Sequence, residues 1–186
     1  MKKSTKILIG VFSILIIMVL VAIISIFTKK QTIPEETGTA ALFFCPQENC
    51  EQALISAINT STKTIWCAFY DLTLNKTIEL LKNKEKQGIN VEIIVDKENY
   101  KKVKKYAFVE SAKNKALMHN KFCMIDNNKI ITGSMNPTTN DATKNNNNLV
   151  IITSKTLAKN YAEEFNEMQK GSYGKGKPTQ YKKIIF

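Results

Sequence analysis

The 186-residue sequence predicts an α/β domain with a central mixed β-sheet flanked by helices on both faces, preceded by one transmembrane helix. Three patterns support this prediction. A long apolar run opens the chain, strand-like segments then alternate with helical ones, and a polar turn joins two apolar segments further along. Strand–helix alternation is typical of parallel β-α-β units, whereas a short polar turn joins antiparallel strands, so both pairings are expected in one sheet.

The apolar run extends from Ile7 to Phe27, 21 residues without a charge or a proline. At about 1.5 Å per residue it would span roughly 30 Å, the thickness of a bilayer core. A buried helix of a soluble protein is the alternative, but such a helix normally has a polar face and this run has none. We therefore predict a transmembrane helix over about residues 7–27, within a membrane anchor formed by residues 1–30.

The charges around the apolar run indicate its orientation. Three Lys and the amino terminus precede the run, and two Lys follow it. Because positive charge tends to stay on the cytoplasmic side, the domain that follows is expected on the extracytoplasmic side of the membrane. Residues 31–39 contain Pro34 and Gly38 without apolar periodicity, which predicts a linker.

The first half of the domain, which is expected to cover residues 40–169, alternates strands and helices. Continuous apolar, β-branched or aromatic segments predict strands, and apolar residues spaced by three or four predict helices. Trp66 and Tyr70 lie on one such strand and are interpreted as packing residues. In chain order the predicted elements are a strand at 40–44, a helix around 53–58, a strand at 64–70, a helix at 74–86 and a strand at 91–95.

The second half of the domain begins with a hairpin. Apolar segments at Met118–Ile125 and Lys129–Gly133 are separated by three polar residues, a spacing typical of antiparallel strands. A strand at 149–153 and a helix at 156–168 are predicted to follow. Residues 170–186 form a polar, Gly-rich C-terminal tail, which we expect to be mobile or loosely docked.

All 27 basic residues are Lys, and the chain contains a single His, His119. The scarcity of His excludes a His-rich metal site, and no cofactor is expected. Beyond residue 30 the chain has 22 Lys against 16 acidic residues, and the stretch from Lys97 to Lys121 alone holds eight Lys against two Glu. Such a stretch is typical of a polyanion-binding surface or of a solvated basic helix. Tyr100 and Tyr106 within it could stack on bases or could be ordinary surface aromatics.

His119 and Lys121 are two residues apart on a predicted strand, so their side chains project from the same face. The hairpin returns the chain and brings Ser134 and Asn136 beside them. A neutral imidazole can attack phosphorus, an ammonium can hold phosphoryl oxygens, and hydroxyl and amide groups can donate to developing charge. Nothing in this set requires a metal, because the carboxylate cluster of a two-metal nuclease is absent and Asp126 is the only acid close to His119 in sequence.

The pattern His119-x-Lys121-x-x-x-x-Asp126, followed by Gly-Ser134-x-Asn136, resembles the HKD signature of the phospholipase D superfamily. The likeness extends over the whole predicted domain and is greatest to the single-motif branch, which includes Nuc-type endonucleases and mitochondrial and Zucchini-like membrane-anchored members. This resemblance implies a phospholipase D-like fold. It also implies that His119 is a nucleophile forming a phosphohistidine, that Lys121 and Asn136 hold the non-bridging oxygens, and that Asp126 supports the turn and Lys121 and does not touch substrate.

The resemblance has two further implications. The superfamily reaction uses a second His to protonate the leaving oxygen and then activate water, and this chain has one His. Single-motif members pair two identical chains around a shared site, so a homodimer is expected. Relatives often carry Glu at the position of Asn147, and an Asn there could bond the His but would stabilise an imidazolium less strongly.

These features predict a metal-independent phosphodiesterase. The basic stretch favours nucleic acid as its substrate, with Lys113 and Lys115 binding that substrate beside the catalytic residues. A phospholipase D that hydrolyses phospholipid headgroups would use the same site and is the alternative. A catalytically inactive, membrane-anchored protein that binds nucleic acid or lipid is a third hypothesis.

The four cysteines lie in different sequence contexts. Cys45 and Cys50 flank the step from the first strand into the first helix, and a disulfide, a zinc site with two further ligands, or free thiols would all be compatible with that position. A disulfide requires an oxidising compartment, which agrees with an extracytoplasmic domain. Cys67 and Cys123 lie in predicted core strands and are interpreted as small buried hydrophobic residues.

Overall fold

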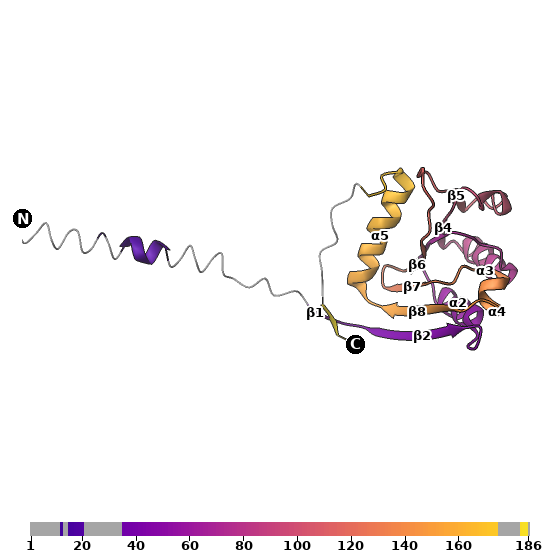
Figure 1. The fold of residues 1–186 in the computed structure, drawn as a ribbon, viewed down its shortest axis with the longest axis horizontal. Helices are drawn as coiled ribbons and strands as arrows, with labels where there is room; N and C mark the ends of the chain where they lie inside the picture. The colour runs from indigo at the N-terminus through magenta and orange to yellow at the C-terminus, as the bar shows by residue number, and fades with distance from the viewer. Residues whose placement is uncertain (1–11, 13–14, 21–34, 175–182, 186) are drawn as a thin grey trace, which may run out of the picture. The chain divides into compact units, whose positions relative to one another are not determined.

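The computed structural model describes residues 12, 15–20, 35–174 and 183–185, and the chain divides into two compact units, residues 1–34 and 35–186 (Figure 1). In the first unit, residues 15–20 are helical. None of the helices among the described residues is both long and apolar enough to span a bilayer. Most of the predicted transmembrane segment, and residues 31–34 of the predicted linker, lie outside the described residues.

The second unit is built on a seven-stranded sheet with the order β2-β8-β7-β6-β3-β4-β5 (Figure 1). Pairing is antiparallel from β2 across to β3 and parallel from β3 to β5, which confirms the predicted mixed sheet. In chain order the strands are β2 (Thr39–Cys45), β3 (Thr64–Phe69), β4 (Asn90–Val95), β5 (Val109–Ser111), β6 (Lys121–Ile125), β7 (Lys129–Gly133) and β8 (Asn147–Thr153).

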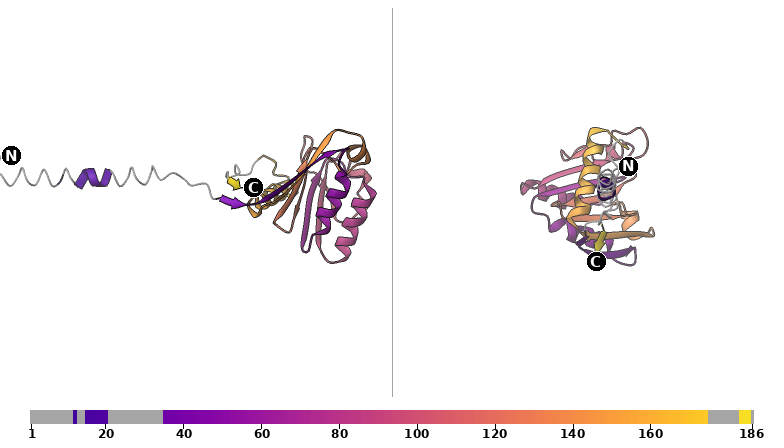
Figure 2. Two further views of the ribbon diagram at one scale, coloured as in Figure 1. Left: turned by 90° about the horizontal axis from the view of Figure 1, so that it is seen from below. Right: turned by 90° about the vertical axis from the view of Figure 1, so that its left-hand side faces the viewer.

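Helices cover both faces of this sheet, as the sequence predicts. α2 (Cys50–Asn59) and α3 (Asn75–Lys86) pack on one face, and α5 (Lys155–Lys170) packs on the other (Figure 2). A short helix, α4 (Thr139–Thr143), lies between β7 and β8 in the chain. The helix predicted at 156–168 lies within α5, and the helix predicted at 74–86 matches α3 to within one residue.

Side chains of the central strands alternate between two cores. Cys123 of β6 belongs to the core beneath α2 and α3, whereas its neighbour Phe122 belongs to the core beneath α5. Phe165 of α5 is fully buried there and stacks on Trp66, with ring centroids 5.5 Å apart. Trp66 is thus a packing residue, and the period-two alternation holds both helix layers against one sheet.

The Lys-rich stretch does not form a long helix. Between Lys97 and Asn120, all of which the structure describes, it forms a 3-10 turn, η1 (Tyr100–Lys102), and the short strand β5. Tyr100 and Tyr106 are half-buried against the core beneath α2 and α3. This placement favours packing over base stacking as the role of the two tyrosines.

The predicted linker and C-terminal tail contain a second, two-stranded sheet. β1 (Glu35–Thr37) pairs in parallel with β9 (Lys183–Ile185). The Glu36 carboxylate accepts hydrogen bonds from Ser154 Oγ and from the backbone N–H groups of Lys155 and Thr156 at the start of α5. The Thr156 side chain, which has the largest effect, and these donors together lower the pKa of Glu36 to about 2, because they stabilise its charged form. Part of the tail expected to be mobile or loosely docked is therefore a paired strand.

All four cysteines are in disulfides. Cys45 is bonded to Cys50, so of the disulfide, the zinc site and the free thiols considered for that pair, the disulfide is the one present. Cys67 is bonded to Cys123, so the interpretation of these two as unlinked hydrophobic residues is wrong. The reason is the strand register: the two residues lie directly opposite each other in the antiparallel pair of β3 and β6, a partnership that neither local segment encodes.

Candidate active site

Four of the predicted site residues, His119, Lys121, Ser134 and Asn136, lie at one end of the main sheet. The register places Phe69, the last residue of β3, opposite Lys121, the first of β6. It also places Gly133, the last residue of β7, opposite Leu149 near the start of β8. The ends of β3 and β7 therefore meet the beginnings of β6 and β8. The chain enters this unit at the opposite end of the sheet, through β1 and the first residues of β2.

His119 and Lys121 share one aromatic neighbour. The His119 ring is exposed and tilted against the Tyr70 ring, with centroids 5.3 Å apart, and the Lys121 ammonium lies 5.5 Å from the centroid of the same ring. Lys121 Nζ also donates to the His119 carbonyl oxygen at 2.9 Å. The three side chains thus form one compact group, in which the tyrosine face contacts both the nucleophile candidate and the cation.

Asp96 fixes the backbone just before His119. Its side chain is fully buried at the end of β4, and Oδ2 accepts from the Met118 N–H at 2.7 Å while Oδ1 accepts from the Glu98 N–H at 2.9 Å. Because the Met118 amide is engaged by Asp96, strand β6 begins at Lys121 instead of at Met118 as predicted. His119 consequently lies on a tethered segment beside the strand.

Ser134 is held tightly by the start of β8. Gly133 before it has a φ of 147°, and a Cβ there would lie 2.2 Å from the Asn148 carbonyl oxygen, so no other residue fits. The Ser134 N–H donates to Asn148 Oδ1 at 3.0 Å, and Ser134 Oγ lies 2.9 Å from that oxygen and 3.0 Å from Asn147 Oδ1. A hydroxyl has one hydrogen, so it donates to one amide oxygen at a time.

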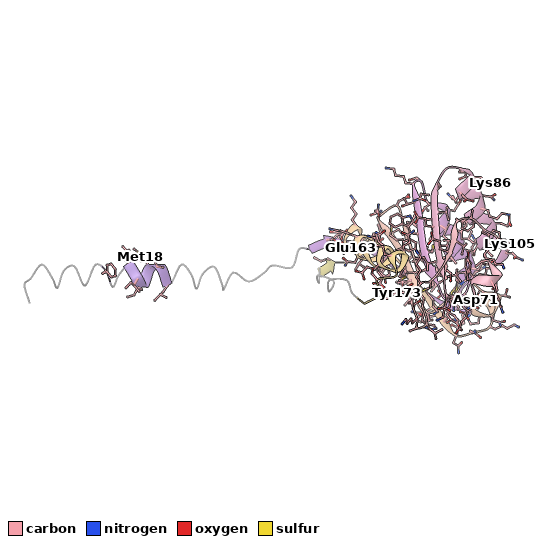
Figure 3. The ribbon with its side chains drawn as sticks, turned by 90° about the horizontal axis from the view of Figure 1, so that it is seen from above. Met18, Asp71, Lys86, Lys105, Glu163 and Tyr173 are labelled. Atoms are coloured by element: carbon pink, nitrogen blue, oxygen red, sulfur yellow. A yellow bond between two sulfur atoms is a disulfide. The ribbon has the colours of Figure 1, made fainter. Side chains whose placement is uncertain are left out.

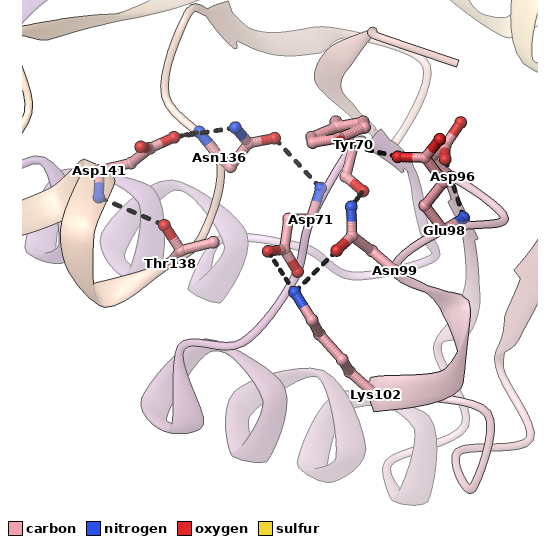
Figure 4. A network of polar contacts seen from close by, with 9 residues as sticks. All are labelled: Tyr70, Asp71, Asp96, Glu98, Asn99, Lys102, Asn136, Thr138 and Asp141. Carbon is pink, nitrogen blue, oxygen red and sulfur yellow. Dashed lines mark hydrogen bonds and ion pairs between the residues drawn. The ribbon is translucent and has the colours of Figure 1, made fainter. Parts of the chain in front are cut away.

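Asn136 is held on both sides of its amide (Figure 4). Its backbone N–H and its Nδ2 both donate to Asp141 Oδ2 at 2.8 Å, and its Oδ1 accepts from the Asp71 N–H at 3.2 Å. An amide nitrogen carries two hydrogens, and one is used here. The other is available to a substrate oxygen, as the resemblance implies for this residue.

Opposing effects act on the charge of Lys121. The side chain is half-buried, and desolvation lowers the pKa of Lys121, while the negative charge of Asp141 raises it. Lys121 therefore depends on a nearby carboxylate to offset the cost of burying its ammonium.

Asp126 is not brought together with the other predicted site residues. It lies at the far end of β6, about 20 Å from His119 at the usual rise per strand residue. Its carboxylate accepts from three consecutive backbone N–H groups, those of Thr62, Lys63 and Thr64, each at 2.8 Å. Burial raises the pKa of Asp126, but these bonds outweigh it, so that the pKa lies below its usual range. Asp126 thus anchors the loop that leads into β3, and the expected support of Lys121 is wrong, because the two residues lie at opposite ends of β6.

The two lysines predicted to bind substrate lie on the segment that leads to His119. Lys113 Nζ donates to the Gln169 carbonyl oxygen at 2.5 Å, at the C-terminus of α5, where a cation is favoured. Lys115 is exposed, and its carbonyl oxygen accepts from Lys97 Nζ at 2.6 Å. Lys113 is therefore engaged by the protein itself, and Lys115 is the freer of the two.

Comparison with known proteins identifies the family. Residues 54–169 match the family described as "Cardiolipin synthase, PLD-like domain", which is more than half of the chain. The chain belongs to the phospholipase D superfamily. As a hydrolase of this superfamily, it acts on phosphodiester bonds.

Individual relatives agree with this assignment. The chain is 27% identical to "Phospholipase D" of Rickettsia typhi over 146 residues, covering 74% of this chain and 72% of that protein. It is 28% identical to "Phospholipase D" of Rickettsia prowazekii over 130 residues, 66% of this chain and 63% of that protein. Among solved structures, Nuc from Salmonella typhimurium has a TM-score of 0.65 at 21% identity, covering 72% of this chain and 95% of Nuc. NucT from Helicobacter pylori has a TM-score of 0.63 at 21% identity, covering 72% of this chain and 97% of NucT. These two likenesses establish the fold.

The sequence analysis missed three residues of this phospholipase D superfamily site. Tyr70 was expected to be a packing residue, because a strand pattern does not show which ring ends beside a catalytic group. Asp96 directly follows the predicted strand at 91–95, and an acid at the carboxyl end of a parallel strand is a recognisable signal. Asp141 lies three residues after Thr138, whose Oγ1 accepts from the Asp141 N–H, and this capping pattern could have located α4.

Tyr70 gives a testable prediction. Replacing it with Leu removes the aromatic face from both His119 and Lys121, and kcat is expected to fall about tenfold, because such contacts contribute on the order of 1 kcal/mol each. Replacing it with Phe keeps the ring and removes only the hydroxyl, which donates to Glu98 at 3.1 Å, so the rate should stay within about threefold of wild type. Steady-state rates on one phosphodiester substrate check this. Equal losses in the two variants would show that the ring contact is unimportant.

Proposed function

We propose that this protein is a metal-independent nuclease that cleaves nucleic acid through a phosphohistidine intermediate in a homodimeric active site. The observation that carries the proposal is the compact group of His119 and Lys121 on the Tyr70 ring, beside the Asn136 amide. The carboxylates at this end of the sheet are engaged by the protein's own donors: Asp71 by Lys102, Asp96 by backbone amides and Asp141 by asparagines. Within residues 35–174, a nucleophile, a cation and an amide donor are thus present without a cluster of carboxylates that could hold a metal ion.

The reaction would proceed in two displacements. His119 attacks phosphorus, a P–N bond forms, and the P–O bond to the leaving nucleoside oxygen breaks. The leaving oxygen takes a proton from the imidazolium of His119 in a second copy of the chain, and that imidazole then removes a proton from the attacking water. Water cleaves the P–N bond and frees His119. Because each chain has one His, both steps require the second copy, and Lys121 and Asn136 would hold the non-bridging oxygens.

Nucleic acid is favoured over phospholipid by charge and by position. Lys101, Lys104, Lys105 and Lys115 are exposed on the segments that follow β4 and precede His119, where they could follow a polyphosphate backbone.

Phospholipid hydrolysis is the second candidate. Leu117 is 53% exposed two residues before His119, and an apolar side chain at the edge of a site can contact acyl chains. The names of the Rickettsia relatives also favour this reaction. We keep it as the alternative because Leu117 lies within the Lys-rich stretch from Lys97 to Lys121, whose charge favours a polyanion.

We also propose that the protein is membrane-bound with its catalytic unit on the extracytoplasmic side. The 21-residue apolar run and the Lys that precede it support this orientation. Both disulfides support it too, because such bonds persist in oxidising compartments.

The proposed function predicts metal-independent cleavage of nucleic acid that weakens with salt. The full chain in detergent would be incubated with labelled single-stranded DNA, with RNA, and with vesicles of phosphatidylcholine and cardiolipin, each with and without EDTA. Oligonucleotide cleavage should be unchanged by EDTA and should fall by about tenfold or more between 50 and 200 mM salt, because several phosphates are neutralised by Lys. EDTA-sensitive cleavage would contradict the mechanism. Headgroup release without oligonucleotide cleavage would favour the phospholipase alternative.

A further inference from the structure

Asp141 lies at one end of the polar network of the site, where it is linked to Asn136 and Thr138 (Figure 4). Both of its carboxylate oxygens accept bonds: Oδ2 accepts from the N–H and the Nδ2 of Asn136, each at 2.8 Å, and Oδ1 accepts from Asn145 Nδ2 at 2.8 Å. Its own backbone N–H is held by Thr138 Oγ1 at 3.2 Å. The carboxylate is half-buried and fixed from three sides, although sequence reasoning assigns it no role.

The first effect of Asp141 is on the direction of the Asn136 amide. The Asp71 N–H requires the carbonyl side of the amide, and Asp141 requires the nitrogen side, so the two partners allow a single orientation. In that orientation the second Nδ2 hydrogen is free to donate. Without Asp141, the amide could rotate and offer a substrate phosphate its oxygen, which would repel the negative charge.

The second effect of Asp141 is on Lys121. Among the residues that the structure describes, Lys121 faces Tyr70, which directly follows β3, the neighbouring His119, and Asp141 on α4. Other carboxylates at this end of the sheet bind elsewhere, since Asp71 pairs with Lys102 at 2.7 Å. Glu98 accepts from the Tyr70 hydroxyl. Asp141 is thus the carboxylate whose charge opposes the desolvation of the Lys121 ammonium.

Asn147 adds a further contact to this network, since its Nδ2 donates to the Asp141 carbonyl oxygen at 3.3 Å. We infer that Asp141 is a positioning residue that fixes the Asn136 amide with one Nδ2 hydrogen ready for a substrate phosphate, and that its negative charge also supports the Lys121 ammonium of the same site. This inference rests on the proposed function, because it assigns Asp141 its role in phosphodiester hydrolysis.

Two variants separate the two effects. Asp141→Asn keeps the shape and leaves one oxygen able to accept from Asn136, but removes the charge. Asp141→Ala removes both the charge and the oxygen that accepts from Asn136. Glu163→Gln is the matched control, because Glu163 is an exposed carboxylate on α5 whose pairing with Lys159 is 3.9 Å long (Figure 3). Comparison of these three full-length chains with wild type distinguishes a local effect of Asp141 from a general effect of losing one negative charge.

The expected results follow from the effect of Asp141 on the pKa of Lys121 and from its effect on the orientation of the Asn136 amide. Removing the Asp141 charge lowers the pKa of Lys121 further, so the alkaline limb of the kcat/KM profile should move to lower pH in Asp141→Asn and remain in place in Glu163→Gln. In the neutral range, kcat/KM should fall about threefold in Asp141→Asn and between about tenfold and a hundredfold in Asp141→Ala, where the amide orientation is also lost.

A measurement without turnover keeps this inference separate from the proposed function. The Lys121 ammonium would be titrated by NMR in ¹³C-labelled lysine samples, with its resonance assigned by Lys121→Met. It should titrate at lower pH in Asp141→Asn than in wild type.

An unchanged titration and an unchanged alkaline limb in Asp141→Asn would overturn the inference even if wild type is a nuclease. Conversely, a wild-type chain inactive on every phosphodiester would contradict the proposed function, while the NMR shift would still decide the role of Asp141. Asp141→Asn, which keeps the side-chain volume, decides the outcome if Asp141→Ala does not fold.

Discussion

Replacement of His119 by Ala is expected to lower kcat for phosphodiester hydrolysis by at least about a thousandfold. His119 is the single His of the chain, so no neighbouring imidazole can take over as nucleophile. Its ring is exposed, and it lies against Tyr70 beside the Lys121 ammonium, where a phosphate could approach both. Rapid acid quench of wild type with labelled substrate should capture a phosphohistidine that is missing from His119→Ala. More than about a tenth of the wild-type rate in the variant would exclude His119 as the nucleophile.

Mixing chains tests whether two copies share the site. If wild-type and His119→Ala subunits exchange freely, dimers with two His form in proportion to the square of the wild-type fraction, so an equal mixture should retain about a quarter of the activity. A monomeric enzyme would retain about half. Mixtures with Glu163→Gln serve as the control and should show no loss, because that residue is exposed on α5 far along the chain from the site.

Removing the Cys67–Cys123 disulfide is expected to cause the largest loss of stability of any change considered for this chain. The two cysteines are 56 residues apart, and closing a loop of that length contributes about 4 kcal/mol in the chain-entropy account. The separation of 5 residues between Cys45 and Cys50 corresponds to about 2 kcal/mol. Urea unfolding should therefore show a drop in the free energy of unfolding about twice as large for the Cys67→Ala, Cys123→Ala double variant as for Cys45→Ala, Cys50→Ala.

The two double variants control for each other. All four cysteines are buried, with exposed fractions of 0 to 3%, so the packing lost on truncation to Ala is similar in both pairs and largely cancels in the comparison. Equal losses in the two variants would mean that the constraint on the unfolded chain does not determine the stabilisation. A larger loss for the Cys45–Cys50 pair would contradict the prediction outright.

Local patterns predicted most of the elements because each is encoded within a short window. The segment 149–153 lies inside β8, and the segment 74–86 corresponds to α3, since a buried strand and an amphipathic helix impose different periods on neighbouring residues. The hairpin at 126–128 was also recognisable. Asp126 and Asn127 there adopt positive φ angles of 52° and 51°, which these residue types tolerate.

The missed features depend on partners far away in the chain. Cys67 meets Cys123 through strand register, and Asp71 meets Asn136 although 65 residues separate them. The pairing of β1 with β9 joins the two ends of the second unit. No local period specifies such contacts. For the same reason, the spacing of His119 and Lys121 located the site, while the ring of Tyr70 and the charge of Asp141 became visible only when β3 and α4 were placed beside β6.

The convergence of distant segments at one end of the sheet determines when a folding chain can become active. The site is assembled from three strands or the residues that follow them, which contribute Tyr70, Lys121, Asn136 and Asp141. Contacts between residues far apart in the sequence form late, because closing the long loop between them costs entropy before the contact contributes any stabilisation. A chain in which the hairpin of β6 and β7 has not yet paired with β3 possesses its nucleophile, but it lacks the Tyr70 ring beside His119 and the Asp71 N–H that orients the Asn136 amide. Competence to cleave would therefore arise with the last elements to assemble, so that incompletely folded copies would leave phosphodiesters around them intact.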